Sequence, residues 1–143
     1  MAKNTIKVKK YADVVEEIKA TEVAITPGML LERTSAGLVQ ACTATTGAVF
    51  PMFALEDELQ GKGIDDNYAV SAQIQCWIPG RGDMVYALLE DGEDVEIGEF
   101  MESAGNGKLQ VLTTGQPIAV AVEAVDDSGS SGTDTGRIIV QIV

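Results

Sequence analysis

The sequence contains no histidine, only two cysteines and few aromatic residues. The absence of histidine removes the commonest general base and the commonest metal ligand. Cys42 and Cys76 do not make a disulfide framework, so we expect two free thiols in a protein made in a reducing cytoplasm. Aromatic residues make up 5% of the chain, so the core must be built from Val, Ile, Leu, Ala and Met.

Basic residues are also scarce, because 10 Lys and Arg stand against 22 Asp and Glu. The net charge of −12 argues against nucleic acid as a partner, since a phosphate backbone needs clustered basic residues. No apolar run approaches the roughly 20 residues that cross a bilayer, and no signal peptide is visible, so no membrane partner is expected.

The charge is unevenly distributed along the chain. Residues 1–10 hold Lys3, Lys7, Lys9 and Lys10 and no acidic residue. A basic segment on an acidic body indicates either that the two contact different partners or that the segment is a solubilising tail.

Apolar runs of about six residues, separated by glycines, predict β-strands through most of the chain. The stretch 78–110 shows the pattern best, because Asp91-Gly92 and Asn106-Gly107 readily form tight hairpin turns. Pro51 indicates an edge or a bulge in its strand. Residues 13–20 fit one or two helical turns or a strand, and 126–136 are a polar surface loop. We therefore predict an all-β fold, a compact β-barrel or sandwich of about nine or ten short strands with at most one short helix.

The chain also repeats part of its pattern 70 residues later, where Gly28, Glu32, Gly37 and Gln40 recur as Gly98, Glu102, Gly107 and Gln110. Further on, residues 54–57 match 124–127 without a gap. Either the chain contains two similar β-units that face each other, or any hairpin requires such glycines and apolar runs. Both interpretations predict related hairpins at 28–42 and 98–112.

No cluster typical of catalysis, phosphate binding or metal binding is present, so we predict no enzyme activity, no cofactor and no metal site. Arg81-Gly82-Asp83 matches an integrin-binding tripeptide but is more typical here of a turn that Asp83 caps. The carboxylates at 56–58, 65–66, 90–99 and 126–134 are typical of a solvated acidic surface.

Trp77 is the only tryptophan. Strand alternation places it on the opposite face from Ile74, Cys76 and Ile78. There it either fills a second layer of the core or anchors an interface.

Several segments together resemble the small head decoration, or cement, proteins of tailed bacteriophages. They are Ala24–Glu32, Ala54–Glu56, Gly63–Ala69, Pro79–Leu89 and Gly98–Ser103. Their order and spacing are similar to those of the family, over roughly residues 22–143. The resemblance implies a β-barrel-type homotrimer on the outside of an icosahedral head, at three-fold and quasi-three-fold positions. Such proteins clamp neighbouring major capsid subunits after the shell expands, and an N-terminal arm reaches into the lattice.

The resemblance therefore implies a non-enzymatic structural protein of the virion, located on the outer capsid surface and made in the host cytoplasm. We expect residues 1–20 to form an extended basic arm, with or without one short helix, and 21–143 to form the decoration domain. The alternating arm suits an exposed sheet edge and an acidic acceptor. The residues expected to contact the major capsid protein are Lys3, Thr5, Ile6, Lys7, Val8, Lys9 and Lys10.

Two further expectations follow. Deleting residues 1–10 should weaken shell binding without changing the fold. The alternative function is a β-sandwich binding module for a carbohydrate or host-surface ligand, which would need an exposed aromatic platform.

Overall fold

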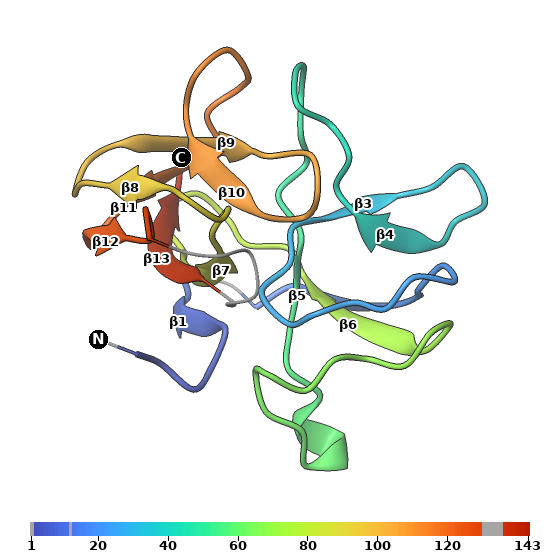
Figure 1. The fold of residues 1–143 in the computed structure, drawn as a ribbon. Coiled ribbons are helices and arrows are strands. Elements are labelled where there is room, and N and C mark those ends of the chain that lie inside the picture. Colours follow the sequence, from blue (N-terminus) through green and yellow to red (C-terminus); the bar gives the residue numbers. More distant parts are fainter. Residues whose placement is uncertain (1, 12, 130–135) are drawn as a thin grey trace.

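The computed structural model describes residues 2–11, 13–129 and 136–143, which form 13 β-strands and one short 3-10 helix, η1 (Glu58–Gln60) (Figure 1). The predicted all-β fold is confirmed. The described strands outnumber the nine or ten expected, because three of them contain only two residues. Part of the loop predicted at 126–136 lies outside the described residues.

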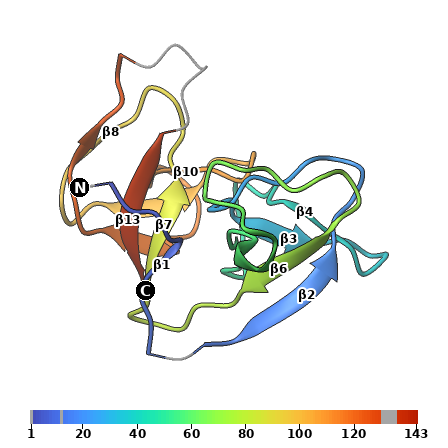
Figure 2. The ribbon, with the colours of Figure 1, turned by 90° about the horizontal axis from the view of Figure 1, so that it is seen from below.

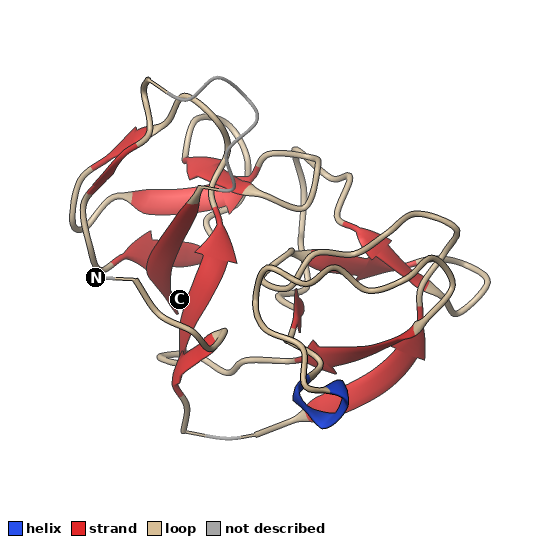
Figure 3. Ribbon diagram, turned by 60° about the horizontal axis from the view of Figure 1, so that its bottom comes forward, coloured by secondary structure: helices blue, strands red, loops and turns tan. Residues whose placement is uncertain are grey.

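The largest sheet has six antiparallel strands in the order β1-β7-β13-β11-β9-β10. These strands are β1 (Lys7–Lys9), β7 (Met84–Leu88), β13 (Arg137–Ile142), β11 (Ala119–Ala121), β9 (Phe100–Ser103) and β10 (Leu109–Val111). Figure 3 shows the strands in two groups that lie side by side, and this sheet belongs to one of them.

The remaining strands form three small sheets. One contains β2 (Val15–Lys19), β6 (Gln73–Trp77) and β5 (Phe53–Ala54), in the order β2-β6-β5. The others are the hairpin of β3 (Leu31–Arg33) and β4 (Val39–Ala41), and the pair β8 (Asp94–Val95) and β12 (Val125–Asp126). None of the described sheets closes on itself, so the body is a compact sandwich-like fold and not a closed barrel.

The core consists of two apolar clusters, which lie on opposite faces of β6. Ile74 and Cys76 belong to one cluster, and Trp77 belongs to the other. This arrangement confirms the predicted alternation, because successive side chains of a strand point to opposite faces.

The two halves of the described chain share the pairing of their main strands, although the second half also contains the pair β8 and β12. In each half the first long strand (β2 or β7) pairs with the last (β6 or β13), and that last strand also pairs with the strand after the hairpin (β5 or β11). A parallel bridge joins the first strand to the returning hairpin strand in both halves, Ala20 to Val39 and Leu89 to Leu109. The pattern repeat therefore reflects two related β-units.

The two predicted hairpins are present and have the same register. Strands β3 and β4 pair Glu32 with Gln40, and strands β9 and β10 pair Glu102 with Gln110. The local sequence pattern thus placed both hairpins correctly.

The gapless match beyond the hairpins is wrong. The Gly28 N–H donates to the Ala54 carbonyl at 2.8 Å, and the Gly98 N–H donates to the Ala121 carbonyl at 2.9 Å. Ala54 therefore corresponds to Ala121 and not to Ala124. The connection that follows the hairpin is three residues shorter in the second half.

Candidate functional site

The N-terminal basic segment is docked onto the body from Ile6 onward. The Ile6 side chain is fully buried in the core, its carbonyl accepts the Tyr86 N–H at 2.9 Å, and its N–H donates to Glu56 Oε2 at 3.2 Å. Strand β1 then forms one edge of the six-stranded sheet, and the segment that fitted either a helix or a strand forms β2. Within the segment 1–20, only residues 2–5 precede this docked part among the residues that the structure describes. Deleting residues 1–10 would therefore damage the fold, contrary to our expectation.

The lysines of the segment remain at the surface, where they form local contacts. Lys7 and Lys10 both bind the carboxylate of Asp13, with Lys10 Nζ 2.7 Å from Asp13 Oδ2. Lys10 first, and then Lys7, hold the pKa of Asp13 below its ordinary value. The Lys7 ammonium also lies 5.8 Å from the centroid of the Trp77 ring. These contacts fix the positions of Lys7 and Lys10 at the surface beside Asp13.

A groove of about 380 Å³ brings most of the predicted contact residues together. Lys9 lies in its lining, and its ammonium is 5.3 Å from the ring centroid of Tyr11. Lys3 is partly exposed but is not part of the lining, whereas Ile6 is in the core beneath. The groove is lined by Thr5, Lys7, Val8, Lys9 and Lys10, and by Val15, Leu55, Glu56, Glu58 and Gln75.

Trp77 fills the core, which was one of its two expected roles. Its side chain is 0% exposed, and its Nε1 has no hydrogen-bond partner among the described residues. It therefore presents no accessible surface to a partner in this structure.

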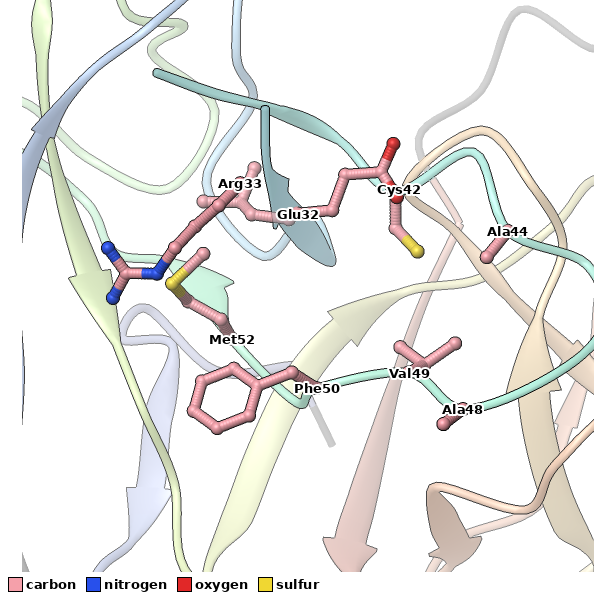
Figure 4. A pocket seen from close by; sticks show the side chains of 9 residues that line it. Glu32, Arg33, Cys42, Ala44, Ala48, Val49, Phe50 and Met52 are labelled. Atoms are coloured by element: carbon pink, nitrogen blue, oxygen red, sulfur yellow. The ribbon is translucent and has the colours of Figure 1, made fainter. Parts of the chain in front are cut away.

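A second pocket, of about 260 Å³, was not found by sequence reasoning (Figure 4). Val49, Phe50 and Met52 line one side of it, and the hairpin residues Glu32 and Cys42 line the other. Phe50, one of the residues that line this pocket, is 61% exposed. The signal in the sequence that could have indicated this pocket is Phe50, which lies next to Pro51 in a loop of small residues.

Each hairpin carries a carboxylate that is hydrogen-bonded in the same way. Glu102 Oε1 accepts bonds from Gln110 Nε2 at 2.8 Å and Thr113 Oγ1 at 2.7 Å, and its Oε2 accepts the Gly115 N–H. Burial acts to raise the pKa of Glu102, but these hydrogen bonds outweigh it and hold the pKa below its ordinary value. These bonds hold Thr113 and Gly115, which follow the hairpin in the chain, against Glu102 in β9.

Glu32 repeats part of this network at the edge of the second pocket. Its Oε1 accepts bonds from Gln40 Nε2 at 2.9 Å and Thr43 Oγ1 at 2.7 Å. Glu32 is only partly buried, and among the described residues no hydrogen bond corresponds to the one that the Gly115 N–H donates to the second oxygen of Glu102. Glu102 and Glu32 therefore allow a carboxylate with hydrogen bonds at both oxygens to be compared with one that lacks, in the described part of the chain, the bond equivalent to that of Gly115.

Two further acidic residues, Asp83 and Glu56, have structural roles. Asp83 is fully buried and accepts the Tyr11 N–H at 2.6 Å and the Gly80 N–H at 2.8 Å, which confirms the predicted turn cap. Glu56 is 8% exposed, so the prediction that it is solvated is wrong. It is buried because it bonds to the Ile6 backbone, which is remote in sequence.

Both cysteines are free, as predicted, and the structure shows that both are buried. Burial raises the pKa of both thiols, and that of Cys76 rises to about 12. Within the described ranges there is no group of three or more acidic or cysteine side chains arranged to hold a metal ion. No helix in the same residues is long and apolar enough to cross a membrane.

No protein-family model matches the chain, and a search of curated proteins found no match.

Proposed function

We propose that the protein is a capsid cement protein. It binds the outer surface of an icosahedral phage head as a homotrimer, at three-fold and quasi-three-fold positions, and stabilises the shell. The proposal starts from the segments that resemble decoration proteins in their order and spacing along the chain. The structural observation that carries it is the gathering of Thr5, Val8 and three lysines along one surface groove of a chain whose net charge is −12.

The groove has the properties that a contact with another subunit requires. Its lysines surround partly buried Val8 on a strand that the core holds in place through Ile6. A rigidly held contact surface loses little conformational freedom on binding. The exposed charges would guide an acidic capsid surface into register and would make binding sensitive to salt.

Trimerisation would strengthen such a contact without any new chemistry. Three linked grooves bind neighbouring capsid subunits with an avidity greater than that of each groove alone. Internal pressure would then have to break several contacts together before the subunits separate.

The first test is co-sedimentation of the purified chain with expanded shells that lack it, with bound copies counted per capsid subunit. We expect saturation near one chain per capsid subunit, as trimers filling the local three-fold positions require. A well-folded protein that does not bind the shells would refute the cement function.

Charge reversal tests the groove itself. We expect Lys9→Glu combined with Lys10→Glu to weaken shell binding by about tenfold or more, because both residues line the groove. Lys62→Glu is a control for reversal of one lysine elsewhere on the surface, since Lys62 is exposed and outside this groove. Equal binding by both variants would exclude the groove as the contact surface.

The carbohydrate-binding alternative has less support. Trp77, Tyr68 and Tyr86 are buried, with at most 9% of each residue exposed. Sugar stacking would therefore depend on the remaining exposed aromatics, such as Tyr11 and Phe50. Binding to a glycan array with no binding to shells would favour this alternative.

A further inference from the structure

The outer edge of strand β2 is a sheet edge with no partner strand among the described residues (Figure 2). The Ile78 N–H donates to the Val14 carbonyl at 2.9 Å, and the Ala20 N–H donates to the Ala72 carbonyl at 2.8 Å. Alternate residues of an antiparallel strand bond to opposite sides. The backbone groups of the odd-numbered residues within 15–19 therefore point away from β6.

The equivalent edge in the other half of the molecule is covered. Strand β7 has the position of β2 in the shared topology, and its outer edge pairs with β1. Tyr86 occupies the position of Glu17, because each pairs with the third residue of the last strand, Ile139 or Gln75. The Tyr86 N–H donates to the Ile6 carbonyl at 2.9 Å. The corresponding N–H of Glu17 has no such strand beside it.

The covering strand β1 shows what kind of segment fits this position. It is extended and antiparallel to its neighbour, and together with the preceding Ile6 it alternates lysines with apolar residues. At the open edge, four of the five residues of β2 are exposed, and Glu17 forms no ion pair with the residues described. An acidic edge favours an incoming strand that carries basic side chains.

A second copy of β2 is a poor partner for the same edge. If two copies of β2 paired in antiparallel orientation through the outward-facing backbone groups of Glu17, their two Glu17 side chains would lie directly opposite each other. Like charges in that position are destabilising. At the other end of the strand, the bridge between Ala20 and Val39 already brings β4 beside it. The free part of the edge thus runs from Val15 to Glu17 and suits a short strand of a different protein.

We propose that the outer edge of β2, centred on Glu17, accepts an extended strand with alternating apolar and basic side chains from the major capsid subunit. The added strand becomes the fourth in the sheet β2-β6-β5, in the way that β1 completes the edge of β7. The identity of the partner rests on the proposed cement function, whereas the open edge and the chemistry of its occupant do not.

A proline substitution tests the edge without disturbing the sheet. Glu17→Pro removes an N–H that the described fold does not use, and proline is tolerated on edge strands when the missing N–H faces solvent. Glu17→Ala is the matched control, because it removes the charge and keeps the N–H. We expect Glu17→Pro to weaken co-sedimentation with shells by about tenfold and Glu17→Ala by about threefold or less.

Thermal unfolding of both variants shows whether the fold is retained. If folded Glu17→Pro binds shells as tightly as the unmodified chain does, the edge proposal is overturned while the cement function stands. If the unmodified chain does not bind shells, the cement function fails, and the edge is then tested by itself.

That independent test uses a synthetic peptide with the sequence of residues 3–10 as the probe strand. We expect saturating peptide to slow amide hydrogen exchange at Val15 and Glu17, while exchange at Glu16 and Ile18 changes little. Unchanged exchange at Val15 and Glu17 would overturn the proposed edge site. Slowed exchange there would support it, whichever protein supplies the natural strand.

Discussion

The two hairpin carboxylates allow one prediction to be tested against an internal control. Glu102 is 1% exposed and accepts three hydrogen bonds, whereas partly buried Glu32 accepts two through its Oε1. Replacing either carboxylate by glutamine keeps the shape and one acceptor oxygen. In Glu102→Gln, however, the new amide N–H₂ would face the Gly115 N–H, so that one donor meets another.

The two substitutions should therefore differ in size. Each loses the charge assistance of two hydrogen bonds, which costs about 1 kcal/mol in total. Glu102→Gln also loses the Gly115 bond and leaves a buried donor unsatisfied, at a further cost of about 2 kcal/mol. For a chain of this length, about 1 kcal/mol shifts the melting temperature by roughly 3–4 °C. We expect Tm to fall by about 10 °C for Glu102→Gln and by about 3 °C for Glu32→Gln.

The pH dependence gives a second check on the same carboxylate. The pKa of Glu102 in the folded protein lies below its ordinary value of 4.5. Its stabilisation is therefore complete above about pH 4.5 and is lost as the pH falls through the lowered pKa. Consequently the stability gap between the unmodified chain and Glu102→Gln should be constant near neutral pH and should narrow in acid.

Circular dichroism melts of the unmodified chain and both variants, at neutral and acidic pH, measure these effects. A Glu102→Gln melting temperature within about 2 °C of that of Glu32→Gln would refute the reasoning. So would a gap between Glu102→Gln and the unmodified chain that does not narrow in acid.

Three further predictions concern backbone strain, the N-terminal segment and the thiols. Measured by urea unfolding, Gly28→Ala should destabilise the fold by about 3 kcal/mol and Gly37→Ala by only about 1 kcal/mol. Both glycines have positive φ, but only a Cβ at residue 28 would lie 2.9 Å from a backbone carbonyl oxygen. Equal costs for the two substitutions would contradict this reasoning. Ile6→Ala should cost about 3 kcal/mol by the same measurement, because the side chain is fully buried, and a cost below about 1 would show that the segment is not docked. A thiol reagent such as Ellman's reagent should react with neither buried cysteine of the folded protein but with both after unfolding, and rapid labelling of Cys76, whose pKa is raised to about 12, would contradict its burial.

Local pattern was enough to predict the fold class because strands and hairpin turns depend on short-range chemistry. The two hairpins, the turn capped by Asp83 and the opposite orientations of Trp77 and Cys76 all follow from glycine placement, short polar side chains or strand alternation. Such features involve residues a few positions apart, so the chain specifies them before its distant parts meet.

The predictions that failed concern contacts between remote segments. Nothing near Glu56 in the sequence indicates that its carboxylate would bond to the Ile6 backbone, 50 residues away. The shortened connection after the second hairpin likewise becomes visible only when β5 and β11 are compared through their partner strands. Local periodicity contains no information about such pairings.

The sequence by itself determined the all-β class, the two hairpins, the free thiols and the basic segment on an acidic body. Only the tertiary structure decided that β1 is docked beside β7, that Trp77 is buried, and that the equivalent edge of β2 is left open in the described part of the chain. The physical reason is that strand identity depends on local alternation and turns. Strand pairing, in contrast, depends on which distant segments bury apolar surface and satisfy backbone hydrogen bonds together.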